Sequence, residues 1–261
     1  RIQGCFTEPA YRDDVDNGVL DKALQENRAF NRWYHTNTRA HKRDGYRSVT
    51  LTLKKTGRIP GDVSDEQLEA IADLADRYSF GELRNTHQQN MVLSDVATDD
   101  LFELWEKLDA LGMATPNLGL LTDIVACPGG DLCALANAKS VPVAEGIQRR
   151  FDDMDYVHDL GPLDINISGC MNACGHHHIG HIGILGVDKK GKEFYQITLG
   201  GRGDKLSRIG EKMGPSFESY EVTDVIEKII NVYVDKRLEN EPFIDTYERI
   251  GMEPFKEHVY G

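Results

Sequence analysis

The chain has 261 residues, of which 40% are hydrophobic, and it carries a formal net charge of −13. This length can bury a sizeable core and is sufficient for two domains. The negative charge argues against a nucleic-acid partner, whose phosphates would repel it, and no apolar run approaches the roughly 20 residues of a membrane span. No secretory signal precedes the body, so we expect a protein of the cytoplasm, which is a reducing compartment.

Residues 1–45 are polar and charge-rich, and they predict an N-terminal helical or linker segment. The pattern indicates a helix from Asn17 to His35. The basic run from Arg39 to Arg43 is interpreted as a solvated linker, with a surface for a partner protein as the alternative.

Residues 46–115 alternate between strand and helix patterns. Val49, Leu51 and Leu53 alternate with polar residues, as in a half-buried strand. Ser64 to Gln67 has the sequence of a capping box that opens a helix, and a strand carrying Arg84 follows. The expected apolar helix faces are Leu68, Ile71, Ala72 and Ala75 in the first helix and Leu101, Leu104, Trp105 and Leu108 in the second. This strand–helix–strand–helix order predicts half of a ferredoxin-like α+β unit.

Residues 116–261 predict a second α+β domain. We expect Asp131 to cap a short helix around Cys133 to Lys139, and Ser140 to cap another with Pro142 in its first turn. Residues 164–168 alternate as a strand, and two more strands are expected at 182–187 and 194–199, joined by a turn at 189–191. Thr223 is expected to cap an amphipathic helix whose core stripe is Val225, Ile226, Ile229, Ile230, Tyr233 and Val234.

Four of the five cysteines form two tight pairs, Cys127 with Cys133 and Cys170 with Cys174. Paired thiols beside glycines indicate a metal centre. An iron–sulfur cluster needs several thiolates, and glycine lets the loop backbone come close to its sulfides. The glycines concerned are Gly129, Gly130, Gly169 and Gly175.

Three other interpretations of the cysteines remain open. Structural zinc usually takes a two-residue gap within each pair, which neither pair has, so zinc would need nearby histidines as ligands. A disulfide framework is typical of short secreted chains with an even cysteine count. Unrelated buried thiols would pack like small hydrophobes, as we expect for the isolated Cys5.

The residues around the cysteines carry a family resemblance. Residues 127–133 with Asn137, followed by Ser-Gly-Cys-Met-Asn-Ala-Cys-Gly at 168–175, resemble the signature of the sirohaem-containing sulfite and nitrite reductases. The resemblance implies that the metal ligands Cys127, Cys133, Cys170 and Cys174 hold a [4Fe–4S] cluster. It also implies that Cys174 bridges to the sirohaem iron.

Two further stretches resemble family elements in the same order. Residues 83–91 resemble the Arg-x-Thr-x-x-Gln-Asn strand that lies along the macrocycle, and residues 200–203 resemble a glycine turn near the cofactor. Arginine suits such positions, because a guanidinium pairs with the carboxylates of sirohaem in bidentate fashion. The cofactor-binding residues implied are Arg84, Thr86, Gln89, Asn90, Asn172, Cys174 and Arg202, while no catalytic residue is assigned.

The resemblance runs from about Tyr46 to the C-terminus and corresponds to the second, cluster-bearing repeat of a typical two-repeat family enzyme. It implies a ferredoxin-like half-domain at 46–115 and a [4Fe–4S]/sirohaem-binding α+β domain at 116–261. The implied activity is a six-electron reduction of sulfite to sulfide, slightly favoured, or of nitrite to ammonia. Electrons would come from a ferredoxin or a flavoprotein and pass through the cluster to sirohaem.

Three alternatives to this cluster-bearing half of a reductase stay open. The chain could be an isolated iron–sulfur electron-transfer module, a cofactor-free fragment, or a one-repeat reductase that dimerises with a second copy. The start at Arg1 favours a fragment whose missing first repeat supplies the substrate side.

Four histidines lie at 176–181, directly after the second cysteine pair. Imidazole is the commonest metal ligand and titrates near neutral pH. The stretch is interpreted first as structural or supporting the site, then as a cofactor contact or proton donor, and last as another metal site.

Overall fold

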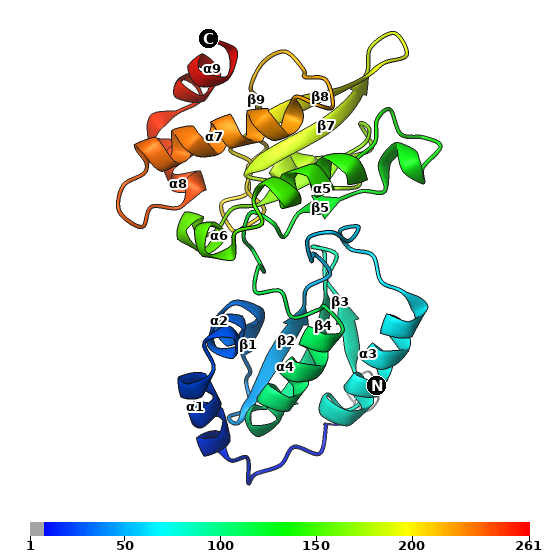
Figure 1. Ribbon diagram of the computed structural model, residues 1–261, viewed down its shortest axis with the longest axis vertical. Helices are drawn as coiled ribbons and strands as arrows, with labels where there is room; N and C mark the ends of the chain where they lie inside the picture. Colours follow the sequence, from blue (N-terminus) through cyan, green and yellow to red (C-terminus); the bar gives the residue numbers. More distant parts are fainter. Residues whose placement is uncertain (1–7) are drawn as a thin grey trace, which may run out of the picture. The chain divides into compact units, whose positions relative to one another are not determined.

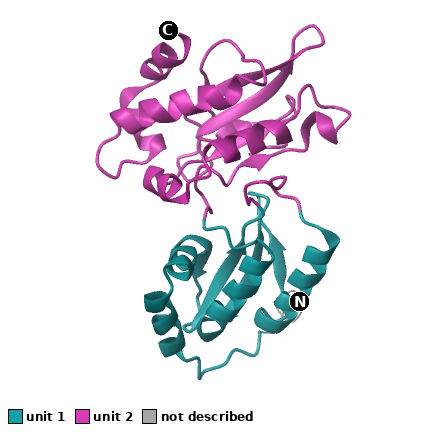
Figure 2. Ribbon diagram, in the orientation of Figure 1, with its two compact units in different colours: residues 1–53, 63–116 teal, residues 54–62, 117–261 magenta. Residues whose placement is uncertain are grey.

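The computed structural model describes residues 8–261, so the prediction for Cys5 lies outside the described residues. The chain forms two compact units (Figure 2): unit 1 comprises the residues up to 53 together with 63–116, and unit 2 comprises 54–62 and 117–261. The described part of the N-terminal segment predicted for residues 1–45, residues 8–45, is grouped with unit 1. Among residues 8–261, no helix has both the length and the apolar character needed to cross a membrane.

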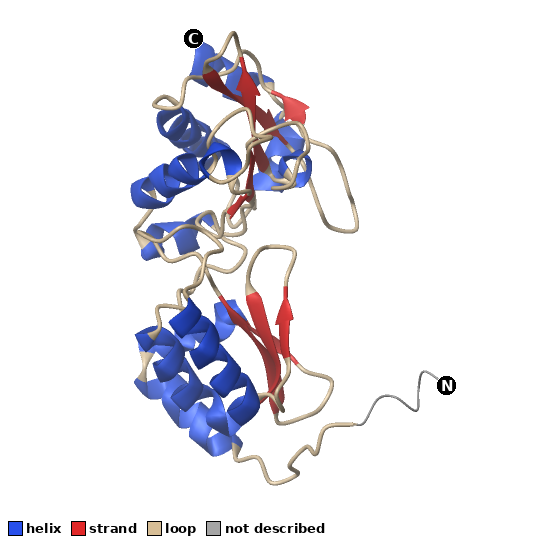
Figure 3. Cartoon of the chain, turned by 90° about the vertical axis from the view of Figure 1, so that its right-hand side faces the viewer, coloured by secondary structure: helices blue, strands red, loops and turns tan. Residues whose placement is uncertain are grey.

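Unit 1 is an α+β fold with a four-stranded antiparallel sheet in the order β1-β2-β4-β3. Its helices lie on one face of that sheet (Figure 3). The strands are β1 (Thr38–Ala40), β2 (Tyr46–Leu51), β3 (Leu83–Asn85) and β4 (Met91–Ala97), and the α-helices are α1 (Asn17–Glu26), α2 (Arg28–Asn37), α3 (Asp65–Tyr78) and α4 (Leu101–Ala110).

Two predicted element boundaries in unit 1 need correction, and one strand was not predicted. The single helix expected over Asn17–His35 is two helices, because Asn27 has extended backbone and its side chain accepts a hydrogen bond from the Phe30 N–H at the start of α2. Strand β4 was missed, since most of it is buried without the two-residue alternation that marks a half-buried strand. The strand at Val49 ends at Leu51, so Leu53 lies beyond it.

Helix α3 confirms its predicted start but only part of its predicted buried face. Ser64 and Gln67 form the predicted capping box at the start of α3. The buried face of α3 is Ile71, Leu74, Ala75 and Tyr78, whereas Leu68 and Ala72, predicted for that face, are exposed. The core also takes in Phe30 and Trp33, which explains why the N-terminal helices belong to this unit.

Unit 2 has a five-stranded sheet in the order β5-β6-β7-β8-β9, parallel from β5 to β7 and antiparallel beyond (Figure 1). Its strands are β5 (Val125–Ala126), β6 (Ile165–Ser168), β7 (Ile182–Asp188), β8 (Glu193–Leu199) and β9 (Glu211–Lys212). Its α-helices are α5 (Val141–Arg150), α6 (Met154–Leu160), α7 (Val222–Lys236), α8 (Phe243–Ile250) and α9 (Glu253–Tyr260).

The strands predicted in unit 2 are confirmed, but two helix predictions are wrong. No helix forms at 133–139. Asp131 ends a single 3₁₀ turn, and turns follow it. Helix α7 begins at Val222 without a side-chain cap, so Thr223 lies inside its first turn. On α7 Val232 is buried, while Val234, predicted for the core, is 39% exposed.

Candidate metal and cofactor site

Both cysteine pairs begin at the same edge of the unit 2 sheet. Cys127 directly follows β5, and Cys170 comes two residues after the end of β6. Since β5 and β6 are parallel neighbours, their carboxyl ends meet at one edge. The Cys127 N–H continues this pairing by donating to the Ile167 carbonyl at 3.0 Å.

The two cysteine loops then meet through their backbones. The N–H groups of Asn137 and Ala138 both donate to the Gly169 carbonyl, at 2.9 and 3.0 Å. A Cβ at Gly169 would lie 2.6 Å from the Ala138 carbonyl oxygen, and one at Gly175 would lie 1.9 Å from the Ile167 carbonyl oxygen. Glycine is therefore required at both positions, because any side chain would push the loops apart.

The loop through the second pair is a series of tight turns. The N–H of Ala173 donates to the Cys170 carbonyl and that of His176 to the Ala173 carbonyl. Ala173 and His176 have left-handed backbones, with φ of 57° and 55°. Successive turns of this kind can direct backbone N–H groups to one side, as in many iron–sulfur and phosphate sites.

The four thiols differ in exposure. Cys127 and Cys170 are buried, Cys133 is partly buried, Cys174 is exposed, and all four are free. The Cys127 sulfur has two hydrogen-bond neighbours: it accepts from the Gly169 N–H at 3.0 Å and lies 3.3 Å from the Ser140 Oγ.

The donor set fits an iron–sulfur cluster in its chemistry. It offers four free thiols, glycines where backbones touch, and a turn-rich loop at the edge of a sheet. In the part of the chain that the structure describes, no three His, Cys, Asp or Glu side chains gather closely enough to hold a single metal ion. A four-iron cluster is larger than one ion, so its thiolates stand further apart.

The histidines after the second pair have different environments. His177 is 1% exposed and its Nδ1 has no hydrogen-bond partner. Burial, and then the neighbouring His178, lowers the pKa of His177 to about 4. The His181 Nδ1 accepts from the Asp164 N–H at 3.1 Å, whereas His176 and His178 are exposed. The run therefore does not act as one set of ligands.

The Arg84 segment is a hairpin in unit 1 and not one continuous strand. Arg84 lies in β3 with its guanidinium exposed, 2.9 Å from Glu82. A turn over Thr86–Asn90 then leads into β4: the Thr86 Oγ accepts from the Asn90 N–H, and the buried Asn90 side chain accepts from the Leu53 N–H. Gln89 lies in the same turn with φ of 57°. Thr86 and Asn90 thus shape the turn, while Arg84 presents its charge at the surface.

Arg202 in the glycine turn is held by carboxylates of its own unit. Its guanidinium nitrogens lie 2.6 Å from Asp204 and 3.0 Å from Glu248, and the side chain is 13% exposed. The hydrogen bonds that the guanidinium donates to these two carboxylates raise the pKa of Arg202. A Cβ at Gly200 would lie 2.1 Å from the Tyr247 ring, which shows how closely this turn packs on α8. The charge of Arg202 is already matched within the unit.

Asn172 lies between Cys170 and Cys174 and is exposed. Sequence reasoning missed two hydroxyls that support the cysteine loops. The Ser168 Oγ accepts from the Gly175 N–H at 3.1 Å, and Ser140, predicted as a helix cap, makes no capping hydrogen bond and lies instead against Cys127.

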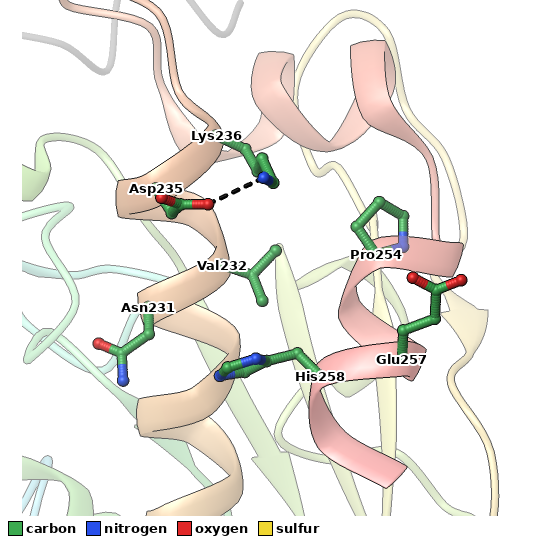
Figure 4. A pocket seen from close by; sticks show the side chains of 7 residues that line it. All are labelled: Asn231, Val232, Asp235, Lys236, Pro254, Glu257 and His258. Atoms are coloured by element: carbon green, nitrogen blue, oxygen red, sulfur yellow. Dashed lines mark ion pairs between the residues drawn. The ribbon is translucent and has the colours of Figure 1, made fainter. Parts of the chain in front are cut away.

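A surface groove lies elsewhere on unit 2, between α7 and α9 (Figure 4). It contains none of the predicted site residues. Its lining is Asn231, Val232, Asp235, Lys236, Pro254, Glu257 and His258.

Known proteins resemble both parts of the chain. The sulfite reductase [ferredoxin] 2 of Mycolicibacterium paratuberculosis is 33% identical over 195 residues, covering 71% of this chain and 35% of that protein. The chloroplastic ferredoxin–nitrite reductase of Zea mays is 29% identical and covers 84% of this chain and 40% of that protein. The structure of the Mycobacterium tuberculosis NirA protein superposes with a TM-score of 0.68 at 29% identity, covering 85% of this chain and 41% of that one.

The chain therefore spans between 35% and 41% of the length of these relatives. Two family models match it in succession. Residues 40–111 match the nitrite/sulfite reductase ferredoxin-like half domain, and residues 120–261 match the nitrite and sulphite reductase 4Fe-4S domain. Because the second match alone covers more than half of the chain, this chain belongs to the nitrite and sulfite reductase family.

Proposed function

We propose that this chain is the cluster-bearing part of a sirohaem-dependent reductase that reduces sulfite to sulfide, or nitrite to ammonia, with six electrons. The observation that carries the proposal is the meeting of two cysteine loops, backbone against backbone, at the carboxyl ends of β5 and β6. Sulfite is the slightly favoured substrate, since the relative named a sulfite reductase is 33% identical and the one named a nitrite reductase 29%.

The four paired cysteines are the proposed ligands of the [4Fe–4S] cluster. When bound, the cluster and sirohaem would store single electrons and reduce the anion. Among the four thiols, Cys174 is the exposed one, which suits the shared position that its place in the motif implies. Cys127 and Cys170 are buried, which suits ligands on the protein side of the cluster.

The remaining predicted cofactor residues divide by their surroundings. Arg84 and Asn172 are exposed and are proposed to contact sirohaem. The guanidinium of Arg84 would pair with the carboxylates of the sirohaem. Thr86, Gln89 and Asn90 are proposed to hold the hairpin turn that presents Arg84. We assign Arg202 to the support of its loop, because Asp204 and Glu248 already compensate its charge.

The electron donor is proposed to be a ferredoxin, since both relatives carry ferredoxin in their names, with a flavoprotein as the other class. The substrate-side residues are proposed to come from a first repeat or from a second copy of the chain. A reducing cytoplasm would suit the thiolates.

The test is to purify the chain anaerobically, record its ultraviolet–visible spectrum, and assay iron, acid-labile sulfide and zinc on the same sample. We expect about four cluster irons per chain, together with sirohaem bands. A cluster without sirohaem would support an isolated electron-transfer module. A colourless protein, or one with stoichiometric zinc, would contradict the proposal.

Replacing Cys174 with serine tests the shared thiolate. We expect Cys174→Ser to abolish the electronic coupling between the two cofactors in the loaded protein, as measured by electron paramagnetic resonance. The control is Cys5→Ser, which changes a cysteine outside the two pairs. Unchanged spectra in Cys174→Ser would remove the bridging assignment.

A further inference from the structure

Ser140 stands where a serine normally caps a helix, but its hydroxyl is used elsewhere. It directly precedes α5, yet its side chain makes no capping hydrogen bond. Its Oγ lies 3.3 Å from the Cys127 sulfur, and the residue is fully buried. The hydroxyl at the N-cap position of α5 is therefore directed at a predicted cluster ligand and not at the helix backbone.

The surroundings hold Ser140 in this place. The preceding carbonyl, that of Lys139, accepts a hydrogen bond from the buried Tyr195 hydroxyl at 2.7 Å. On the other side, a Cβ at Gly129 would lie 2.8 Å from the Ser140 Oγ and one at Gly169 would lie 3.1 Å from it. The hydroxyl thus occupies a space that both glycines keep open, and the sulfur is its neighbour there.

The direction of the hydrogen bond follows from the chemistry of a ligand. A cysteine that binds iron is a thiolate and has no proton to give, so the Ser140 hydroxyl must be the donor. With the Gly169 N–H at 3.0 Å, the Cys127 sulfur then accepts two hydrogen bonds. Hydrogen bonds to the sulfurs of a cluster help to set its reduction potential.

We propose that the Ser140 hydroxyl donates a hydrogen bond to the Cys127 thiolate and thereby raises the reduction potential of the cluster. This inference rests on the proposed function, because it requires the cluster. One-electron reduction adds one negative charge to the cluster, so a donor at the sulfur stabilises the reduced form more than the oxidised form. Ser140 is a positioning residue that acts through Cys127.

The experiment is an anaerobic redox titration of the cluster-loaded protein with dithionite as the electron donor, followed by electron paramagnetic resonance. In Ser140→Ala we expect the ratio of reduced to oxidised cluster at a fixed potential to fall by up to about tenfold, which corresponds to about 59 mV for one electron. Ser140→Thr keeps the hydroxyl and should retain a potential near that of the natural protein.

The matched control is Ser168→Ala, because Ser168 supports the second cysteine loop through the Gly175 N–H without touching a sulfur in any contact the structure records. Pulsed resonance in D₂O gives a second readout. One exchangeable deuteron coupled to the reduced cluster should disappear in Ser140→Ala and remain in Ser168→Ala.

The outcomes separate the two proposals. A cluster whose potential and deuteron couplings are unchanged in Ser140→Ala would overturn the role of Ser140 and leave the proposed function standing. Equal shifts in Ser140→Ala and Ser168→Ala would also overturn it, since loosened loops would explain both. A natural protein without any cluster would overturn the proposed function and the Ser140 inference together.

Discussion

The cysteine loops of unit 2 and the Arg84 hairpin of unit 1 both carry predicted cofactor residues, but they are built in opposite ways. The loops depend on buried backbone contacts that leave no space for a Cβ at Gly169 or Gly175. The hairpin carries Arg84 on a three-residue strand with an exposed guanidinium. We therefore expect substitutions in the loops to change cofactor binding and stability together, and a substitution of Arg84 in the hairpin to change cofactor binding alone.

The largest effect is expected from disrupting the close contact between the second cysteine loop and β6. In Gly175→Ala the new Cβ would overlap the Ile167 carbonyl oxygen, so β6 or the loop must move. We expect a loss of about 3 kcal/mol in the free energy of unfolding, measured with urea, and a loss of bound iron.

Gly130→Ala is the matched control on the first cysteine loop. Its Cβ would have no neighbour closer than 3.4 Å, and its backbone is not left-handed. We expect the stability to change by less than about 1 kcal/mol. Equal losses in the two variants would show that the loops do not depend on the Gly175 contact.

A smaller effect is expected from the buried histidine beside the loops. His177 has a pKa of about 4 in the folded chain and should titrate near its ordinary value of about 6.5 when unfolded. Between these values the unfolded chain binds the extra proton, so stability falls as the pH drops from about 6.5 towards 4. We expect the free energy of unfolding to be about 1–2 kcal/mol lower at pH 5 than at pH 7 through His177, after a discount for solvent screening. Unfolding measured at the two pH values checks this.

His177→Gln should remove this part of the pH dependence. His178→Gln changes an exposed neighbour that is the lesser cause of the lowered pKa of His177, so it should keep most of the pH dependence. The same slope between pH 5 and 7 in His177→Gln and the natural chain would contradict the assignment. Such a result would mean that the loop region is not sealed from water at His177.

Arg202 sharpens the comparison. The sequence placed it with Arg84 among the cofactor residues, but the Arg202 side chain is largely buried against carboxylates whereas that of Arg84 is exposed. Arg202→Ala removes a hydrogen-bonded ion pair to Asp204 within the loop and another to Glu248, which joins the glycine turn to α8. We expect the free energy of unfolding to fall by about 1 kcal/mol. A variant of unchanged stability that loses sirohaem would restore Arg202 to the cofactor residues.

Arg84→Ala should have the smallest effect on stability and a specific effect on binding. Because the guanidinium is exposed, we expect the free energy of unfolding to stay within about 0.5 kcal/mol. Sirohaem retention should fall while cluster iron is kept, as measured by the spectrum and iron assay of one sample. Full sirohaem content would remove Arg84 from the cofactor residues, and loss of both cofactors would contradict the separation of binding from folding.

Much of the fold was predictable where one local signal decides the structure. The capping box at Ser64 and the strands flanking the 189–191 turn are confirmed, since neighbours in sequence supply both the pattern and the partners. The helix expected at 133–139 failed for a non-local reason. The N–H groups of Asn137 and Ala138 pair with the Gly169 carbonyl, about thirty residues further along, and are not available to a helix.

The sequence by itself indicated the family, through the motif residues around the two cysteine pairs and the stretches at 83–91 and 200–203, because each motif is made of residues that are neighbours in the chain. Only the tertiary structure decided what surrounds those residues. It placed the Ser140 hydroxyl on Cys127 and matched Arg202 with Glu248. The partners of a buried hydroxyl or a charge come from segments far apart in the chain, and only folding brings them within hydrogen-bond distance.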